Sequence, residues 1–443
     1  MTLPRLLSIS LGLWASAVLP LLAQERTVAE IAVNAGSRER VNLPVQATID
    51  GVPLQTYPNG IRLYEVAGSR ATPVPVQVRA GDEQQLTWIL SGRTAPNAIR
   101  RYQLRVNTDT TLAAAAPSSS RVNVQDTGEN LNISIAGHPV LSYRYRPQPV
   151  PAGVDSVFSS SGFIHPLYSP QGQVLTRIQA PDHWHHYGIW NPWTHTKFEG
   201  RQVDFWNIGS RQGRVRAAGV LERTSGEVYG SFRSAHEFVD YTSGAPKIPL
   251  REQWEVTVWN AAPDQHTWLI DFASTLSPAT DSAITIEAYR YQGFSMRATE
   301  RWGDANSSLI TSEGKTKADA NGTRARWMNQ SGVSGAREGT SGVLFFTTPT
   351  NYNFPEELRI WPVGQNNGVE NVYVNFNPAQ TRDWVLEPGH TYRLRYRMVV
   401  YDGQITNADA ESQWQSYASP PQVTVRMLTT ALTPPPTARS PGQ

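Results

Sequence analysis

LREQWEVTVW, residues Leu250 to Trp259, is the stretch of this chain that decides its fold. From Trp254 to Val258 apolar side chains alternate with polar ones, and this period of two places the apolar set on one face of a β-strand. The same alternation returns at 268–272, after turn-forming residues at 262–265. The two stretches therefore predict a hairpin with one face on a core.

Short β-branched runs separated by turn residues continue this pattern in both directions. They lie at 28–33, 41–49, 61–66, 74–78, 86–90 and 102–106, and then at 131–135, 140–146, 215–221, 284–291, 343–347, 372–376 and 392–401. Convincing helical periodicity is absent after the first residues of the chain. The sequence therefore predicts an all-β protein, with a small N-terminal β-sandwich followed by a large one.

The first 23 residues have the character of a secretory signal peptide. Arg5 supplies a positive charge, an apolar run follows, and Leu-Leu-Ala ends at Ala23. An uncleaved anchor is the alternative, but an apolar run of about 17 residues interrupted by Pro20 is short for a bilayer span. We expect cleavage, and no later run is apolar enough to cross a membrane.

The rest of the chain is expected to form two domains. Residues 24–106 hold the first group of strand runs and predict the small sandwich. Residues 107–120 include four consecutive alanines and a Pro-Ser-Ser-Ser run, which predict a linker. Residues 121–428 predict the large sandwich, and 429–443, with three consecutive prolines, predict a disordered tail.

Charge and cysteine content limit the function classes. The 39 basic and 37 acidic residues are mixed along the chain and give a net charge of +2, so no basic track for a nucleic acid is present. The absence of cysteine excludes disulfides, thiolate metal sites and thiol nucleophiles. Together with the signal peptide, it favours a bacterial periplasmic or secreted protein. The 14 tryptophans and 17 tyrosines suit both a β-core and sugar stacking.

Four of the nine histidines lie in one run, PDHWHHYGIWNPWTH, from Pro181 to His195. In an extended strand, His183 and His185 point to one face, while Trp184 and His186 point to the other. Imidazole titrates near neutrality, transfers protons and ligates metals. This run is therefore the most function-like feature of the sequence.

Three interpretations of the run remain open, and the first is a catalytic pocket. There a histidine acts as general base or acid, and Asp182 or Glu199 orients it. Trp184, Trp190 and Trp193 form a stacking wall for the substrate.

The other two interpretations are a metal site and a structural cluster. Asp182, His183 and His185 offer a carboxylate and two imidazoles, a set that suits zinc, copper or non-haem iron. In a structural cluster, the histidines are hydrogen-bonded beside packed tryptophans.

The motifs around the run resemble those of a known family. DHWHHYGIW from Asp182, followed by GRQVDFW ending at Trp206, is similar to the signature of the PmoA-like family of secreted proteins, a domain of unknown function. Supporting matches are YQGFSMR at 291–297, ARWMNQSG at 325–332, TPTN at 348–351, LEPG at 386–389, Arg397 and the Asp-Gly pair at 402–403. The resemblance covers most of 122–401. Tyr187 and Tyr401 depart from it, since an arginine and a histidine are common at those places.

This resemblance implies a large domain like the β-supersandwich of galactose mutarotases and several polysaccharide lyases, and carbohydrate chemistry by analogy of fold. Members of the family are often labelled methane oxygenase, but a membrane-embedded enzyme of that kind needs transmembrane helices. We predict as catalytic residues His183, His185, His186, Glu199 and Arg297. We predict as substrate-binding residues Trp184, Trp190, Trp193, Asp204, Trp206, Tyr291, Arg326 and Trp327.

Three functions from different classes follow. The preferred one is a secreted carbohydrate-active enzyme that uses histidine acid/base chemistry on a glycan or sugar, as a lyase, hydrolase or epimerase. The second is a non-catalytic glycan-binding protein. The third is a metal-dependent oxidoreductase, for which zinc or copper would be the cofactor; the first two need none.

A row of arginines stands apart from these motifs. Arg393, Arg395 and Arg397 share one face of the predicted strand 392–401. They suit either the carboxylate of an acidic sugar or a solvated outer face. His236 and Glu237 would add an acid and a base, but isolated strand residues of these types are expected on the surface.

Overall fold

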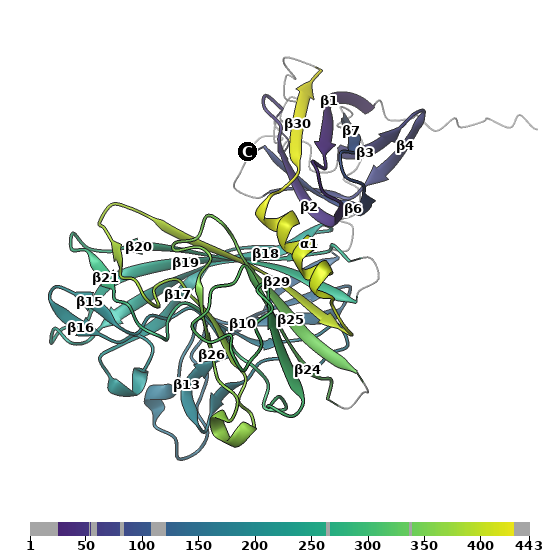
Figure 1. The fold of residues 1–443 in the computed structure, drawn as a ribbon. Coiled ribbons are helices and arrows are strands. Elements are labelled where there is room, and N and C mark those ends of the chain that lie inside the picture. Colours follow the sequence, from purple (N-terminus) through teal and green to yellow (C-terminus); the bar gives the residue numbers. More distant parts are fainter. Residues whose placement is uncertain are drawn as a thin grey trace, which may run out of the picture.

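The computed structural model describes residues 25–52, 54, 60–79, 84–107, 121–262, 266–335 and 339–428. Within these residues the protein is nearly all β, and it forms a small and a large β-sandwich, so the predicted fold class is confirmed (Figure 1). The predicted signal peptide (1–23), the predicted tail (429–443) and nearly all of the predicted linker (107–120) lie outside the described residues.

The small sandwich packs a five-stranded sheet against a three-stranded sheet around Trp88, Leu104 and Val106. Its strands are β1 (Glu25–Asn34), β2 (Arg40–Thr48), β3 (Ile61–Ala67), β4 (Arg70–Val74), β5 (Val76–Val78), β6 (Gln85–Thr94), β7 (Ile99–Asn107) and β30 (Gln422–Met427). The sheets have the orders β30-β1-β7-β3-β4 and β2-β6-β5. The last strand of the described chain therefore completes the domain formed by the first ones.

The large sandwich packs two eight-stranded sheets face to face. The strands of the first sheet are β8 (Val122–Asp126), β9 (Asn130–Ile135), β10 (His138–Arg144), β11 (Phe163–Leu167), β14 (Ile189–Trp190), β22 (Phe294–Arg297), β26 (Glu357–Ile360) and β27 (Tyr373–Asn377). Those of the second are β17 (Gly213–Thr224), β18 (Tyr229–Asp240), β19 (Lys247–Trp259), β20 (Thr267–Pro278), β23 (Ser307–Thr311), β24 (Trp327–Val333), β25 (Thr340–Thr347) and β29 (Tyr392–Asp402). Their orders are β26-β27-β22-β14-β11-β10-β9-β8 and β17-β18-β19-β20-β29-β25-β24-β23.

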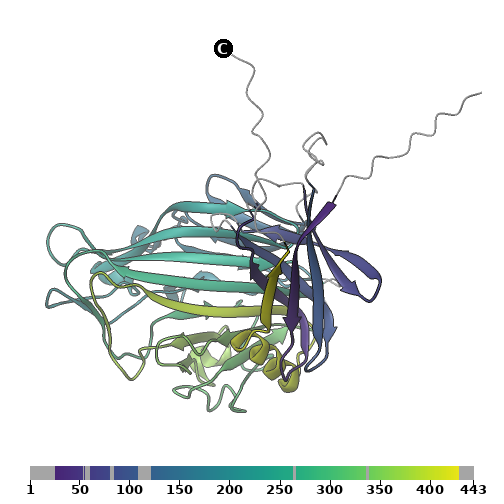
Figure 2. The same ribbon diagram turned by 90° about the horizontal axis from the view of Figure 1, so that it is seen from above.

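The predicted hairpin forms the middle of the second sheet. β19 and β20 are antiparallel partners, with Val256 opposite Phe272. The apolar face of this pair, including Trp254 and Ile270, is buried in the core that it shares with Phe294 of the first sheet. Figure 2 shows the long strands of this sheet side by side. The alternation of LREQWEVTVW thus sets which face of the sheet meets the core.

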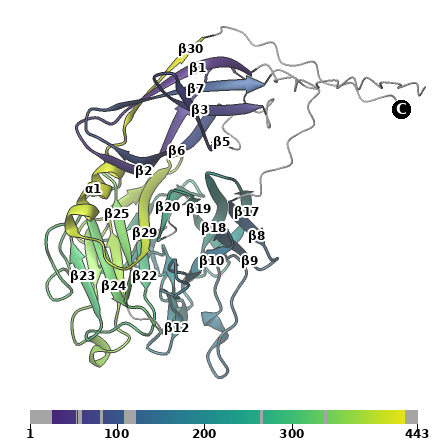
Figure 3. The ribbon, with the colours of Figure 1, turned by 90° about the vertical axis from the view of Figure 1, so that its right-hand side faces the viewer.

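Two smaller sheets extend the large sandwich. β12 (Ile178–Ala180) and β13 (His183–Tyr187) form a ribbon, and β15 (Thr196–Phe198), β16 (Arg201–Val203), β21 (Ile284–Ile286) and β28 (Trp384–Leu386) form a four-stranded sheet of order β16-β15-β21-β28. The ribbon lies at the end of the large sandwich away from the small one (Figures 1 and 3). It carries the first half of the histidine run.

An α-helix, α1 (Asn407–Ala418), was not predicted and corrects the expectation of no helix. Its first turn is capped by Thr406, whose hydroxyl accepts a hydrogen bond from the Asp409 N–H at 3.1 Å. Trp414 packs with Leu344 and Phe346 of β25, and its indole donates to the Thr347 carbonyl at 2.9 Å. The helix thus leads the chain from the large sandwich to β30 in the small one. None of the helices within the described ranges has the length and apolar character needed to cross a bilayer.

Candidate functional site

The histidine run passes from the ribbon into the first large sheet at Gly188. β13 pairs with β12, whereas β14, one residue later, pairs with β22. Gly188 joins them with a φ of 59°, and a Cβ at this position would lie 2.3 Å from the Ile164 carbonyl oxygen. Only glycine fits this joint without moving the backbone.

Three histidine rings of the run contact one another. The His183 and His186 rings are stacked with centroids 4.7 Å apart, and the His185 ring meets them edge-on at 5.5 Å and 4.8 Å. The prediction that His186 faces away from His183 and His185 is therefore wrong. The ribbon is irregular, because three residues of β13, Trp184 to His186, lie opposite the single residue Gln179 of β12. A bulge of this kind adds twist and turns the side chains that follow it.

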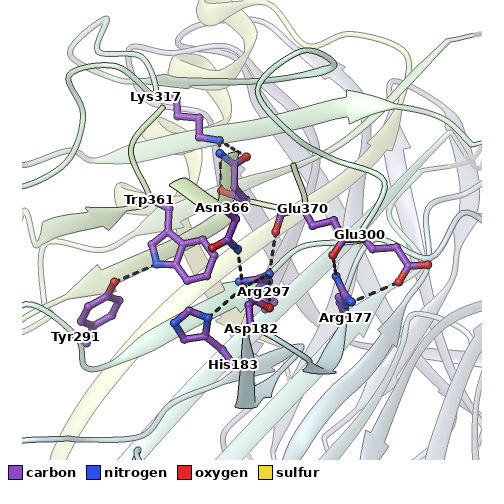
Figure 4. A network of polar contacts seen from close by, with 11 residues as sticks. Arg177, Asp182, His183, Tyr291, Arg297, Glu300, Lys317, Trp361, Asn366 and Glu370 are labelled. Carbon is purple, nitrogen blue, oxygen red and sulfur yellow. Dashed lines mark hydrogen bonds and ion pairs between the residues drawn. The ribbon is translucent and has the colours of Figure 1, made fainter. Parts of the chain in front are cut away.

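Asp182, directly before β13, is held by three donors (Figure 4). Its Oδ2 accepts from Arg297 Nη2 at 2.9 Å, from Asn366 Nδ2 at 2.6 Å and from His183 Nδ1 at 3.0 Å. Desolvation alone would raise the pKa of the Asp182 carboxyl, but the hydrogen bonds and the Arg297 charge outweigh it and lower the pKa well below its usual value. Asp182 is therefore an anion at neutral pH.

His183 directs its second nitrogen away from this carboxylate. A carboxylate only accepts, so Nδ1 of His183 carries the shared proton and Nε2 has a free lone pair. Among the described residues, Nε2 has no hydrogen-bond partner, and the side chain is 29% exposed. Arg297, Asp182 and His183 thus follow one another as cation, carboxylate and imidazole, an order that orients a general base.

Arg297 anchors this series from inside the protein. Its side chain is fully buried, its guanidinium lies 4.3 Å from the centre of the Trp361 ring, and Nη2 also donates to the Glu370 carbonyl at 2.8 Å. Trp361 in turn donates to the Tyr291 hydroxyl at 3.0 Å, and its ring centre lies 4.8 Å from that of His183 (Figure 4). The predicted residues Arg297 and Tyr291 therefore lie within one contact network with His183.

The two neighbouring histidines favour the neutral form. His186 is buried against Trp190 and Tyr373, with ring centroids 5.1 Å and 5.3 Å away. Desolvation, followed by repulsion from neighbouring cations, lowers the pKa of His186 well below its usual value. The same causes lower the pKa of His185 to about 4. Both side chains suit uncharged hydrogen bonding better than proton uptake at neutral pH.

The tryptophans of the run divide by exposure. Trp190, Trp193 and Trp206 are buried, and Trp193 belongs to the main core, so the predicted stacking wall of Trp184, Trp190 and Trp193 does not form. Trp184 is partly exposed on the other side of the ribbon. It lines an open groove of about 560 Å³ together with Arg177 and Glu300, which form an ion pair at 3.8 Å.

Glu199 and Asp204, predicted as a catalytic and a substrate-binding residue, have structural contacts instead. Glu199 lies exposed in the turn between β15 and β16 and pairs with Lys247 at 2.6 Å, not with a histidine. Asp204 accepts from the Trp206 and Asn207 backbone N–H groups, each at 2.8 Å, so it shapes the turn that places Trp206 beside His186.

Arg326 and Trp327 are not brought to the histidines. Both donate to Glu411 of α1, at 3.2 Å and 2.8 Å, and Arg326 also stacks on Trp414. They belong to the junction between β24 and the helix that the sequence reading missed.

A second buried polar group lies in the core between the sheets. His236 is completely buried, contrary to the expectation of a surface residue, and its ring nitrogens contact Glu252 at 3.3 Å and the Tyr143 hydroxyl at 2.6 Å. Glu252 also accepts from Asn191 at 2.7 Å. His236, Glu252 and Tyr143 each have a hydrogen-bond partner in this group, as buried polar groups require, whereas Oδ1 of Asn191 has none. Glu237, on the opposite face of β18, pairs with Arg216 at 2.7 Å.

Sequence reasoning missed Trp361 and Asn366, which complete the site from a distant loop. Asn366 and Asn367 have φ values of 50° and 55° and precede Gly368. An Asn-Asn-Gly run is a turn signal. It does not reveal that the turn folds over Asp182.

The arrangement of Asp182, His183 and His185 bears on the metal interpretation. The Asp182 carboxylate is already used by Arg297, Asn366 and His183. Within the part of the chain that the structure describes, no three or more His, Cys, Asp or Glu side chains form a group that could hold a metal ion.

Comparison with known proteins gives one family and distant structural likenesses. Residues 130–415 match a family model described as "Family of unknown function (DUF6807)". No curated protein matches the chain.

Two of the solved structures that are similar to the chain are sugar-processing enzymes. An alpha-mannosidase from Enterococcus faecalis V583 has a TM-score of 0.40 and 10% identity, over 92% of this chain and 47% of that chain. The GH36 alpha-galactosidase AgaB from Geobacillus stearothermophilus has a TM-score of 0.29 and 9% identity, over 66% of this chain and 41% of that chain. The match spans less than half of either enzyme, and likenesses of this size carry no activity over to this chain.

Proposed function

We propose that this chain, which belongs to the DUF6807 family of unknown function, is an exported carbohydrate-active enzyme in which His183 acts as general base and acid. The observation that carries the proposal is the series Arg297, Asp182 and His183. It fixes the tautomer of an imidazole whose side chain is 29% exposed.

The chemistry follows from this geometry. His183 Nε2 removes a proton from a hydroxyl, a water or an acidic C–H of the sugar, while Nδ1 keeps its own proton and donates it in a hydrogen bond to the Asp182 carboxylate. The anionic Asp182 stabilises the imidazolium that forms, and buried Arg297 keeps the carboxylate in place. The imidazolium then returns the proton to the product. Hydrolysis, elimination and epimerisation all use such a step.

Substrate contacts are proposed at His183, whose side chain is 29% exposed, and in the groove lined by Trp184. Trp184, which is partly exposed, lines the groove with Arg177, whereas Trp361 is fully buried and supports His183 from behind. An aromatic face packs against the C–H face of a sugar, and a guanidinium donates to its hydroxyl or carboxylate groups. A glycan that crosses β13 would meet both surfaces.

A non-catalytic glycan-binding protein is the second candidate. The observation that favours it is that two of the three contacting histidines are poorly suited to proton transfer. His186 is buried, and His185 favours the neutral form. In that case Trp184 and the groove supply the affinity, and His183 only donates or accepts hydrogen bonds. The oxidoreductase suggested by the methane oxygenase label is not preferred, because the Asp182 carboxylate is already engaged by three donors.

A glycan screen separates these functions. Purified protein is incubated with plant and bacterial glycans, and products are detected as new reducing ends, unsaturated sugars or changed sugar stereochemistry. We expect one of these products without added metal. Binding without any product, unchanged in H183A, would favour the binding protein. Activity that appears only after zinc or copper is added to metal-free protein would favour the oxidoreductase or another metal enzyme.

A further inference from the structure

A second cleft, of about 440 Å³, lies between the small sandwich and the outer face of the second large sheet. Arg79, which follows β5, reaches it from the small sandwich, while β19 and β29 supply Glu255 and Arg395. Residues of both sandwiches line the cleft, so it lies at their junction. β13 lies at the opposite end of the large sandwich (Figures 1 and 3). The cleft is therefore separate from the histidine site.

Two arginines of the β29 row, Arg393 and Arg395, line this cleft. Each carboxylate along the cleft already has an arginine partner: Glu255 pairs with Arg79 and Arg393, Glu222 with Arg233, and Asp271 with Arg397. Four arginines, including Arg395, line the cleft with three carboxylates, and Arg397 pairs with Asp271 from outside the lining. Counted together, five arginines meet three carboxylates. Two positive charges are in excess, and such an excess favours an anionic ligand.

Arg395 is the arginine left for a ligand. It is exposed, and its hydrogen bond from Nη2 goes to the Thr350 hydroxyl at 3.0 Å. Among the described residues no carboxylate pairs with it. Arg397, two residues later, is instead buried and bound to Asp271 at 2.5 Å and 2.7 Å. The three arginines of the row thus differ in role although they share a strand face.

We propose that this cleft binds an acidic saccharide, with a uronate carboxylate on Arg395. A guanidinium matches a carboxylate with two parallel N–H groups. Gln46 and Ser231 line the same cleft and offer amide and hydroxyl groups for sugar hydroxyls. A volume of about 440 Å³ lies in the range of small-ligand sites. The proposal does not rest on catalysis at His183.

Calorimetric titration of the full mature chain with a trimer of galacturonate tests this proposal. We expect the trimer to bind and the neutral galactose trimer to bind at least tenfold more weakly. R395A should weaken binding of the acidic trimer at least tenfold, and added salt should weaken it in the wild type. R70A is the matched control, because Arg70 is an exposed strand arginine outside the cleft and should leave binding unchanged.

Variants separate this cleft from the histidine site. H183A should bind the acidic trimer as the wild type does, whatever its activity. The proposal is overturned if the wild type fails to bind the trimer, if acidic and neutral trimers bind equally, or if binding survives in folded R395A. Loss of binding in H183A with normal binding in R395A would assign the acidic sugar to the histidine site instead. Arg395 is exposed, so R395A is expected to fold, and its melting curve checks this.

Discussion

At the scale of single residues, the candidate site depends on one backbone joint and one ordered series of charges. Gly188 lets the chain leave the ribbon directly after the histidines. Arg297 then meets Asp182 from β22, and Asp182 orients His183. The series therefore runs from the fully buried Arg297 to the partly exposed Asp182 and His183.

Gly188→Ala should destabilise the protein by more than the strain of a positive φ at an alanine. We expect G188A to lower the free energy of unfolding by about 3 kcal/mol, since a Cβ 2.3 Å from the Ile164 oxygen adds a clash to the strain of a positive φ. G200A is the control. Gly200 also has a positive φ, 78°, but a Cβ there meets open space, so the loss should be about 1 kcal/mol. Equal losses in urea unfolding would contradict this account of Gly188.

The sequence predicted part of this site. The clustered histidines and the motif with Arg297 identified residues that the structure does bring together. Asn366 lies 184 positions from Asp182, and no local pattern predicts that contact. In the sequence, Trp193 and Arg326 could not be distinguished from the aromatic and charged residues that do lie beside His183. Burial in the core and pairing with α1 assign them elsewhere.

At the scale of elements, alternation predicted the strands well and the helix not at all. The hairpin of β19 and β20 keeps the register that its period of two requires. Helix α1 has few apolar side chains to mark a helical face, although Thr406 and Asp409 form a recognisable N-terminal cap. β30 alternates clearly, but its pairing with β1, almost 400 residues away, lies beyond local patterns.

Removal of β30 should destabilise the small sandwich. Val423, Val425 and Met427 pack against its core, so a chain ending at Ser419 should lose about 2–3 kcal/mol. We expect the Tm of the small sandwich to fall by about 10 °C or more in differential scanning calorimetry. A chain ending at Leu428 retains β30 and serves as control. Equal Tm values for the two chains would show that β30 contributes no stability.

At the scale of the whole molecule, partly buried histidines that the fold keeps neutral should make the protein sensitive to acid. Desolvation, followed by the charge of Arg144, lowers the pKa of His165 to about 4, and desolvation followed by His183 does the same for His185. The unfolded chain takes up these protons below about pH 6.5, whereas the folded chain does not. The free energy of unfolding is therefore highest above pH 6.5 and falls as the pH decreases toward 4.

His185→Asn should reduce this dependence. Between pH 7 and pH 5, each such histidine lowers the free energy of unfolding by about 1–2 kcal/mol. In urea unfolding, the free energies of H185N at the two pH values should therefore differ by that much less than those of the wild type. H195N is the control, because His195 is exposed and stacks on Tyr289. If H185N and the wild type lose the same stability, His185 is not held neutral by the fold.

From the sequence, only the fold class of the whole molecule could be predicted. Period-two alternation and the lack of helical periodicity predicted two β-sandwiches, which is what the structure contains. Which sheet faces the small domain depends on contacts such as Arg79 with Glu255, which join separate domains. The cleft at that junction therefore appears only in the folded protein.

The rate of product formation from the glycan that responds in the screen tests the central claim most directly. We expect H183A to lose at least 100-fold in rate, the size of a missing general base, with its melting curve and glycan affinity nearly unchanged. H195A, which alters an exposed histidine outside the network, should keep the wild-type rate. A folded H183A that forms product as fast as the wild type would contradict the assignment of acid/base chemistry to the Arg297, Asp182 and His183 series.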